Sequence, residues 1–323
     1  PKKVLLYGVI FSIITIALYF TITSLWILML IRFIHGIAFG FSSTATGTIS
    51  SRIIPENRKG EGIGYYGLSV TLASAIGPFI GLVFNNHLGF KSIFAISLLS
   101  ILIAFVLSIF IKRLPVLNHN LEAKDQPSGM HAYLQKEALP ISLVVILIGV
   151  AYSSVLSFLS IYSEKINLVT TSSFFFIVFA IVTFITRPFT GKIYDNYGEN
   201  KVMYPVLLSF TFGLIILGFT HTSIILLIAA AFIGFGYGTI VPTAQAIAIQ
   251  QSPANKMGLA TSTFYIFADF GAGMGPFILG IIIPFIGYRQ LYMAMGMLVI
   301  IALILYYYVH GRMHKNPFNK REY

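Results

Sequence analysis

The 323-residue chain is 57% hydrophobic and only 10% charged, with a mean hydropathy of +0.86. Soluble globular proteins carry about 25% charged residues, so this chain cannot cover a water-facing surface and must have the lipid bilayer as most of its solvent. These values exclude a soluble enzyme, a secreted domain and a disordered protein. Because cysteine is absent, a disulfide framework, a thiolate metal site and a cysteine nucleophile are excluded as well.

Ten continuous apolar runs of about 20 residues predict ten membrane-spanning helices. Their continuity argues against a β-barrel, whose strands alternate apolar and polar residues. We therefore expect an all-α membrane protein. In chain order the runs cover residues 4–21, 24–47, 62–85, 91–111, 138–160, 168–190, 202–219, 223–249, 258–284 and 290–310.

The net charge of +11 is explained by where the basic residues lie. Seventeen of the 21 Lys and Arg residues fall on one set of alternate loops and chain ends. The other set holds only Lys91, Lys165 and Arg289, and Arg32 lies inside a predicted span. Cytoplasmic loops carry the excess of Lys and Arg, so the sequence predicts a multi-pass plasma-membrane protein with both ends of this chain in the cytoplasm. A nucleic-acid partner is not expected, because no basic domain with a recognition motif is present.

The longest polar stretch, residues 112–137, divides the predicted spans into two groups. It contains Pro, Gly and several charges of both signs. We expect it to be a cytoplasmic linker between an incomplete N-terminal bundle, residues 1–111, and a C-terminal bundle, residues 138–323.

The two groups of spans are related by an internal repeat with a shift of 198 residues. The tetrapeptide Gly77-Pro78-Phe79-Ile80 falls on Gly275-Pro276-Phe277-Ile278, and Lys3-Val4 falls on Lys201-Val202. Repeats in the same orientation are typical of transporters. Two predicted spans separate the linker from Lys201, whereas none precedes Lys3. We therefore expect a twelve-helix parent in which two further helices precede residue 1.

Three motifs narrow the interpretation. Residues 191–201 carry the pattern G-x-x-x-D-x-x-G followed by a basic residue, residues 32–36 carry R-x-x-x-G, and residues 73–81 carry a G-x-x-x-G-P pattern with Ala73 in the place of the first Gly. With the repeat and the linker, they resemble the major facilitator superfamily. The resemblance implies the major facilitator fold, two parallel-related helix bundles with ten of twelve helices present. The third motif resembles that of drug:proton antiporters.

The resemblance implies a monomeric secondary transporter in the lipid bilayer, exporting a small organic molecule in exchange for protons. A proton-coupled importer of a metabolite or anion is the alternative, and a non-transporting receptor or scaffold is a third reading. We expect no enzyme activity, cofactor or metal ion, because H-E-x-x-H, G-x-S-x-G and Walker motifs are absent.

Ionisable residues within spans are the candidates for proton coupling. Asp269 is the only one of ten acidic residues deep in a predicted span, and Arg32 is the only basic one. A charge there is costly, so it should face a water-filled cavity or a partner. His35 follows Arg32 by three residues, hence on the same helical face, and imidazole titrates near neutral pH.

Polar and aromatic side chains of the later spans are candidates for the substrate cavity. The candidates are Thr243, Gln245, Tyr152, Tyr237 and Tyr265. The simpler interpretation of each aromatic residue is that it packs between helices or faces lipid.

The Gly-Pro pairs bend their helices and permit close approach. The resemblance implies that Gly77, Pro78 and Gly81, with Gly275 and Pro276, shape helices at the contact of the two bundles.

The motif after the span 168–190 provides Gly191, Asp195 and Gly198 in a tight turn. The resemblance suggests that Asp195 either caps a helix or pairs with a basic residue, Arg187 or Lys201. Such a contact would stabilise one state of a transport cycle. A solvated loop carboxylate is the simpler reading.

Overall fold

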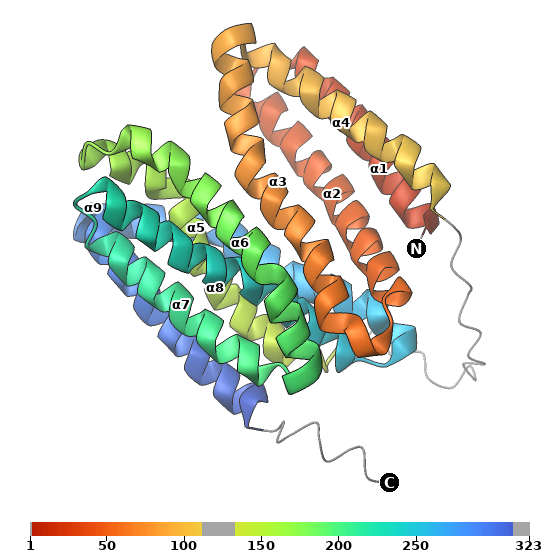
Figure 1. Ribbon diagram of the computed structural model, residues 1–323. Helices are drawn as coiled ribbons and strands as arrows, with labels where there is room; N and C mark the ends of the chain where they lie inside the picture. The colour runs from red at the N-terminus through yellow and green to blue at the C-terminus, as the bar shows by residue number, and fades with distance from the viewer. Residues whose placement is uncertain (1, 112–132, 313–323) are drawn as a thin grey trace. The chain divides into compact units, whose positions relative to one another are not determined.

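The computed structural model describes residues 2–111 and 133–312, and within them all regular structure is helical. The predicted all-α class is confirmed. Most of the predicted linker lies outside the described residues. The helices are α1 (Lys2–Leu18), α2 (Leu25–Ile53), α3 (Lys59–Leu88), α4 (Phe90–Phe110), α5 (Leu139–Lys165), α6 (Val169–Tyr197), α7 (Asn200–Gly218), α8 (Ser223–Gln250) and α9 (Met257–Tyr306) (Figure 1).

Eight helices of the described chain are long and apolar enough to cross a membrane. The count of ten predicted spans is not confirmed, because α3 is not among the eight and α9 forms one unit of 50 residues. The backbone of α9 leaves helical geometry at Gly287, where φ is 75° and ψ is 171°. Glycine adopts a positive φ without the steric cost of a Cβ atom, so Gly287 permits the break between the two segments of α9.

The chain forms two compact units, and α3 contributes to both. One unit contains Pro1–Ile53 and Gly77–Gln126, and the other contains Ile54–Ile76 and Pro127–Tyr323. The first half of α3 is therefore part of the same unit as α5 to α9, which we call the C-terminal unit. The division of the sequence at 112–137 remains a prediction.

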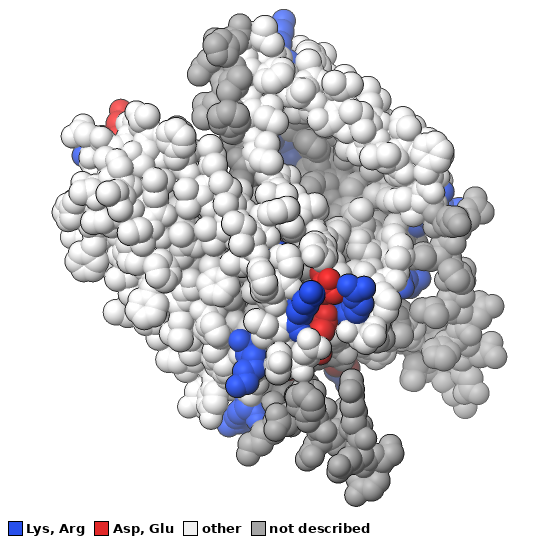
Figure 2. All heavy atoms as spheres, in the orientation of Figure 1, with Lys and Arg blue, Asp and Glu red and all other residues white. Residues whose placement is uncertain are grey.

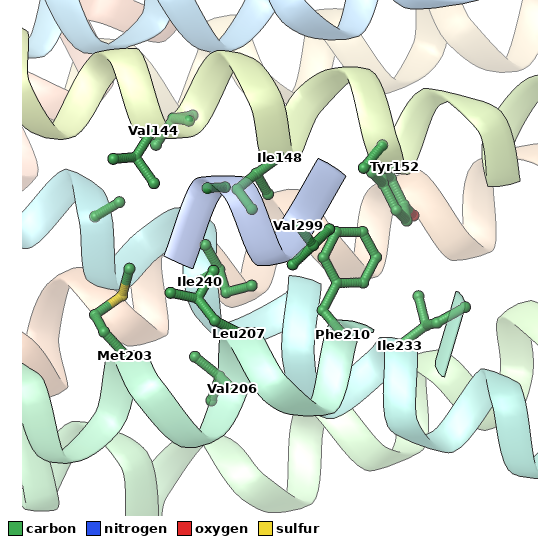
Figure 3. Close-up of a cluster of buried hydrophobic side chains, with 14 of the residues drawn as sticks. Val144, Ile148, Tyr152, Met203, Val206, Leu207, Phe210, Ile233, Ile240 and Val299 are labelled. Atoms are coloured by element: carbon green, nitrogen blue, oxygen red, sulfur yellow. The ribbon is translucent and has the colours of Figure 1, made fainter. Parts of the chain in front are cut away.

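The core of the C-terminal unit is built from apolar side chains of α5, α7, α8 and α9. These side chains are almost completely buried and interdigitate between the helices (Figure 3). Such packing holds helices together in lipid, where association depends on close van der Waals contact rather than on removal of water. Labelled members are Val144, Ile148 and Tyr152 from α5, Met203, Val206, Leu207 and Phe210 from α7, Ile233 and Ile240 from α8, and Val299 from α9.

Glycines allow α5 and α9 to approach closely. A Cβ atom on Gly271 would lie 2.4 Å from the carbonyl oxygen of Ile146, and one on Gly275 would lie 2.0 Å from the Ser153 hydroxyl oxygen. From the other helix, a Cβ atom on Gly149 would lie 3.0 Å from the amide nitrogen of Ala272. The spacing Gly271-x-x-x-Gly275 is the pattern by which membrane helices bring their backbones together.

The other unit contains α1, α2, α4 and the second half of α3. Its buried apolar residues form two small clusters, one around Leu5, Val9 and Ile49 and one around Ile16 and Ile31. Much of α2 carries exposed apolar side chains, as expected for a helix in lipid.

Charged side chains of the C-terminal unit lie near the ends of its helices on the visible face, and the long flanks between are almost free of them (Figure 2). This distribution fits helices whose middle sections face a bilayer.

Candidate substrate and proton-coupling site

Asp269 lies in the first segment of α9 with its side chain exposed on the C-terminal unit. Its carboxylate lies close enough to the phenols of Tyr237 in α8 and Tyr265 in α9 to interact with them electrostatically. Among the described residues no hydrogen bond or ion pair engages its carboxylate. The structure thus places three of the predicted site residues near one another.

A chain of polar contacts runs from α8 through α9 to the first half of α3. The Gln245 amide nitrogen lies 3.4 Å from the Tyr265 hydroxyl, which lies 3.4 Å from the Tyr66 hydroxyl. Gln245 is buried within the apolar helix α8. A buried side-chain amide needs hydrogen-bond partners, and Tyr265 provides one. Thr243 is buried as well but takes no part in this chain within the described residues.

Tyr152 and Tyr237 stack on each other in the core. Their ring centroids are 3.5 Å apart and the ring planes differ by 11°. Tyr152 also stacks on Phe179, and Tyr237 lies near Phe210. Tyr152 is 3% exposed, so it packs in the core, in line with the simpler sequence reading. Tyr237 connects this aromatic core to Asp269.

Arg32 and His35 both contact Tyr19, within the unit that contains α1, α2 and α4. The Arg32 guanidinium carbon lies 5.6 Å from the centre of the Tyr19 ring, and the Tyr19 hydroxyl lies 3.1 Å from His35 Nδ1. Tyr19 itself is buried and stacks on Phe94 with centroids 5.0 Å apart. Because both side chains contact the same residue, Arg32 and His35 lie on the same face of α2, as predicted.

Asp195 caps the N-terminus of α3, one of the two roles predicted for it. Its two carboxylate oxygens accept the backbone N–H groups of Gly60 at 2.7 Å and Glu61 at 2.9 Å. The first N–H groups of a helix lack partners within the helix and favour negative charge. Within the described residues the carboxylate makes no ion pair with Arg187 or Lys201.

Arg187 in α6 instead binds the backbone of α3. It is 3% exposed, and its Nε donates to the Gly64 carbonyl oxygen at 2.7 Å. Glycine at position 64 leaves room for the guanidinium, since a Cβ atom there would lie 3.0 Å from Nε. Together with the Asp195 cap, this bond joins the first half of α3 to α6.

The tight turn predicted for the motif is wrong for Gly191 and Asp195, because α6 continues to Tyr197 and contains both of them. Gly191 serves the same contact with α3. A Cβ atom on Gly191 would lie 2.7 Å from the Cα atom of Glu61, so α6 and α3 touch through their backbones. Gly198 ends α6 with φ of 85°, a conformation that favours glycine. Lys201 is exposed in the first turn of α7.

The residues of the Gly-Pro motifs have different surroundings. A Cβ atom on Gly77 or Gly81 would meet no atom of the described residues within 4 Å, whereas Gly275 packs on α5 within its own unit. Pro276 lies inside α9 and Pro78 inside α3. The role of these motifs at a contact of the two bundles stays a prediction.

The family model described as Major Facilitator Superfamily matches residues 1–217 and 141–322. The chain belongs to this superfamily. Its members are transporters, and this chain is accordingly a multi-pass membrane protein of a transporter family.

Among curated proteins, similar relatives are named "Multidrug resistance protein MdtG". The protein from Salmonella arizonae is 24% identical over 281 residues, which cover 83% of this chain and 68% of the relative. The one from Klebsiella pneumoniae is 24% identical over 292 residues, covering 87% and 70%.

Solved structures of the superfamily share the fold. The human organic anion transporter MFSD10 has a TM-score of 0.73 at 16% identity, covering 94% of this chain and 76% of its own. The E. coli fucose:proton symporter FucP has a TM-score of 0.70 at 16% identity, covering 95% and 83%.

Two tyrosines that take part in these contacts, Tyr19 and Tyr66, were not among the predicted site residues. Tyr19 follows the last residue of α1, and Tyr66 lies in α3, seven residues after Lys59. Neither belongs to a motif. The sequence shows only that each is a tyrosine close to polar residues. Other tyrosines of the chain share this property, so it could not identify these two.

Proposed function

We propose that the chain belongs to a secondary exporter that moves a small organic molecule, a drug or an endogenous metabolite, out of the cell in exchange for protons. The observation that carries this proposal is Asp269. An exposed carboxylate in a long apolar helix is costly in a membrane unless it faces water or a ligand. Beside it, Tyr237 and Tyr265 offer aromatic surface and hydroxyl groups to a substrate. The relatives named MdtG, which are described as multidrug resistance proteins, support export as the direction of transport.

Two further sets of contacts support alternating access. The N-terminal half contains a cluster for proton coupling around Tyr19. In it Arg32 provides a cation and His35 provides a ring that can bind a proton. Asp195 and Arg187 bind the first half of α3 through its backbone. In the proposed cycle this contact stabilises one state and opens in the other.

The topology that goes with this function follows from charge and length. Seventeen Lys and Arg residues against three favour a cytoplasmic position for both ends of this chain. Counting α3 as a span, and α9 as two spans separated at Gly287, gives ten in this chain. We further propose that the protein acts as a monomer.

The proposal is tested by transport measurements on the full-length protein. A screen of compounds in cells with and without the gene first identifies an exported compound. Its efflux should stop when an uncoupler collapses the proton gradient. Asp269→Asn should abolish proton-coupled efflux and Asp269→Glu should retain part of it. Glu164→Gln, which changes a carboxylate in the last turn of α5, should leave efflux unchanged. Full efflux by Asp269→Asn, or efflux that persists with the uncoupler, would refute the mechanism.

Import of a metabolite or anion is the second candidate, and the exposed guanidinium of Arg32 favours it. The direction of net movement separates the two functions. An importer makes cells accumulate the compound when a proton gradient is imposed from outside, whereas an exporter depletes it.

A further inference from the structure

A pocket of about 600 Å³ opens at one end of the C-terminal unit. It lies where α5 and α7 begin and where α6 and α8 end, beside the π-helical turn that follows α9 (Tyr307–Gly311). It shares no residue with the Asp269 site. Asp269 is 12 residues from the start of α9, about 18 Å at 1.5 Å per residue. The pocket is thus a cavity separate from the Asp269 site.

The described lining of the pocket is richer in acidic than in basic side chains, unlike the chain as a whole. Two of its lining residues are Glu137 and Glu199, and none of those described is Lys or Arg. The whole chain has 21 basic residues but only ten acidic ones. Two carboxylates in one cavity therefore stand out, and they favour a positively charged occupant.

The polar wall of the pocket is held by its own hydrogen bonds. His310 is 2% exposed, and its Nε2 lies 3.0 Å from a Glu199 carboxylate oxygen while its Nδ1 lies 2.8 Å from the Gln251 amide nitrogen. The Tyr194 hydroxyl donates to the Gln250 side-chain oxygen at 2.6 Å. These bonds join α6, α7, α8 and the turn after α9, so Glu199 is kept in a fixed position.

The remaining wall is apolar and comes from Pro140, Ile247 and Val309. Ligand pockets of about 300–1,000 Å³ combine such surface with a few fixed polar groups. Among the described residues, no group of three His, Asp or Glu side chains is arranged to hold a metal ion. The lining therefore suits an organic cation with an apolar body.

We propose that this pocket is a second binding site, for an organic ammonium ion. Glu137 and Glu199 accept its N–H groups, and Pro140, Ile247 and Val309 cover its apolar part. The site is independent of the proposed proton coupling, because it uses none of the same residues.

The test uses equilibrium binding to the full chain purified in detergent. The probe is dansylcadaverine, a fluorescent aryl compound with one primary ammonium group. Its N-acetylated form has nearly the same shape but no charge, and serves as the matched control. We expect saturable binding of dansylcadaverine and at least tenfold weaker binding of the acetylated compound.

Three variants locate the probe. Glu137→Gln and Glu199→Gln should each weaken binding by about tenfold or more, since the negative charge that strengthens the hydrogen bond to the ammonium group is lost. Glu164→Gln, at the opposite end of α5 from Glu137, is the matched control and should bind like the parent. Glu137→Gln keeps the test valid if Glu199→Gln disturbs the His310 bond and does not fold.

Asp269→Asn separates this proposal from the proposed function. Unchanged probe affinity in Asp269→Asn, with loss in the Glu137 and Glu199 variants, supports the pocket. Loss of binding in Asp269→Asn with none in the two glutamate variants would show that the probe occupies the proposed transport site and would overturn the inference. Equal affinity for the acetylated probe would overturn it too.

Discussion

The two halves of α3 use the same residue type in opposite ways. In the first half, Gly60, Gly64 and Gly67 face α6 and α8, and a Cβ atom on Gly67 would lie 2.5 Å from a side-chain carbon of Pro242. In the second half, an added Cβ atom on Gly77 or Gly81 has no atom of the described residues within 4 Å. The same contrast recurs in α9, where Gly271 is packed and Gly273 is open.

The contrast shows that a glycine in a membrane helix has no fixed meaning. A packed glycine marks a place where two backbones touch, and substitution there forces the helices apart. An open glycine weakens the helix, since glycine costs about 0.5–1 kcal/mol relative to alanine in a helix interior. Alanine substitutions at paired positions of one helix therefore separate the two roles.

The largest effect is expected at Gly271. Gly271→Ala places a methyl group against the Ile146 carbonyl, a backbone atom that cannot turn away, and should lower the free energy of unfolding by about 3 kcal/mol. Gly273→Ala, two residues along the same helix, should leave it unchanged or raise it by up to about 1 kcal/mol. Reversible unfolding in mixed detergent and SDS micelles measures both. Equal values for the pair would show that α5 and α9 do not touch as described.

The same comparison within α3 should give a smaller effect. Gly67→Ala meets the rigid ring of Pro242 and should cost about 2 kcal/mol. Gly77→Ala is the matched control and should cost nothing. The same unfolding assay reads out both variants. If Gly67→Ala were as stable as the parent, the first half of α3 would not pack on α8.

Removing the cap of α3 should have a local effect of about 1–1.5 kcal/mol. Asp195→Ala leaves the N–H groups of Gly60 and Glu61 without their acceptor, so their exchange with deuterium should speed up about tenfold. Asn196→Ala, the exposed neighbour, is the control. Mass spectrometry of the peptide that contains residues 59–64 measures the exchange. No change in that peptide would mean that the cap is absent in solution.

The smallest effect is expected at Tyr19. Tyr19→Phe keeps the ring beside Arg32 and removes only the hydroxyl contact with His35, which should cost about 0.5–1 kcal/mol. Tyr7→Phe, at an exposed position of α1, should cost nothing in the same unfolding assay. A Tyr19→Phe protein as stable as the Tyr7→Phe control would mean that the contact with His35 contributes nothing to folding.

Hydropathy predicted the helices well because the apolar runs are long. It placed a break between 284 and 290, where Gly287 interrupts α9. It ended the second span at 47, whereas α2 continues to Ile53, since helices extend beyond the apolar section that hydropathy detects. It could not show that α3 divides between two units, because that depends on contacts and not on polarity.

The sites were predicted unevenly for a similar reason. Asp269 and Arg32 were found because a charge in an apolar run is visible in the sequence alone. The partners of Asp195 are 134 and 135 residues away and are backbone groups, so no side-chain pattern could identify them. The acidic pocket escaped notice because Glu137 and Glu199 are separated by two helices along the chain.

The contact between Asp195 and α3 can be broken by a change in the backbone of α3 but not by most changes of its side chains. Its donors belong to the main chain, so replacement of the side chains at 60 and 61 cannot remove them unless proline is introduced. They converge on one carboxylate only while the first turn of α3 is wound. Unwinding that single turn would release Asp195 with α6 still in place. Because the bond from Arg187 to the Gly64 carbonyl lies beyond that turn, such unwinding would remove one of the two attachments of α6 to α3 and leave the other in place.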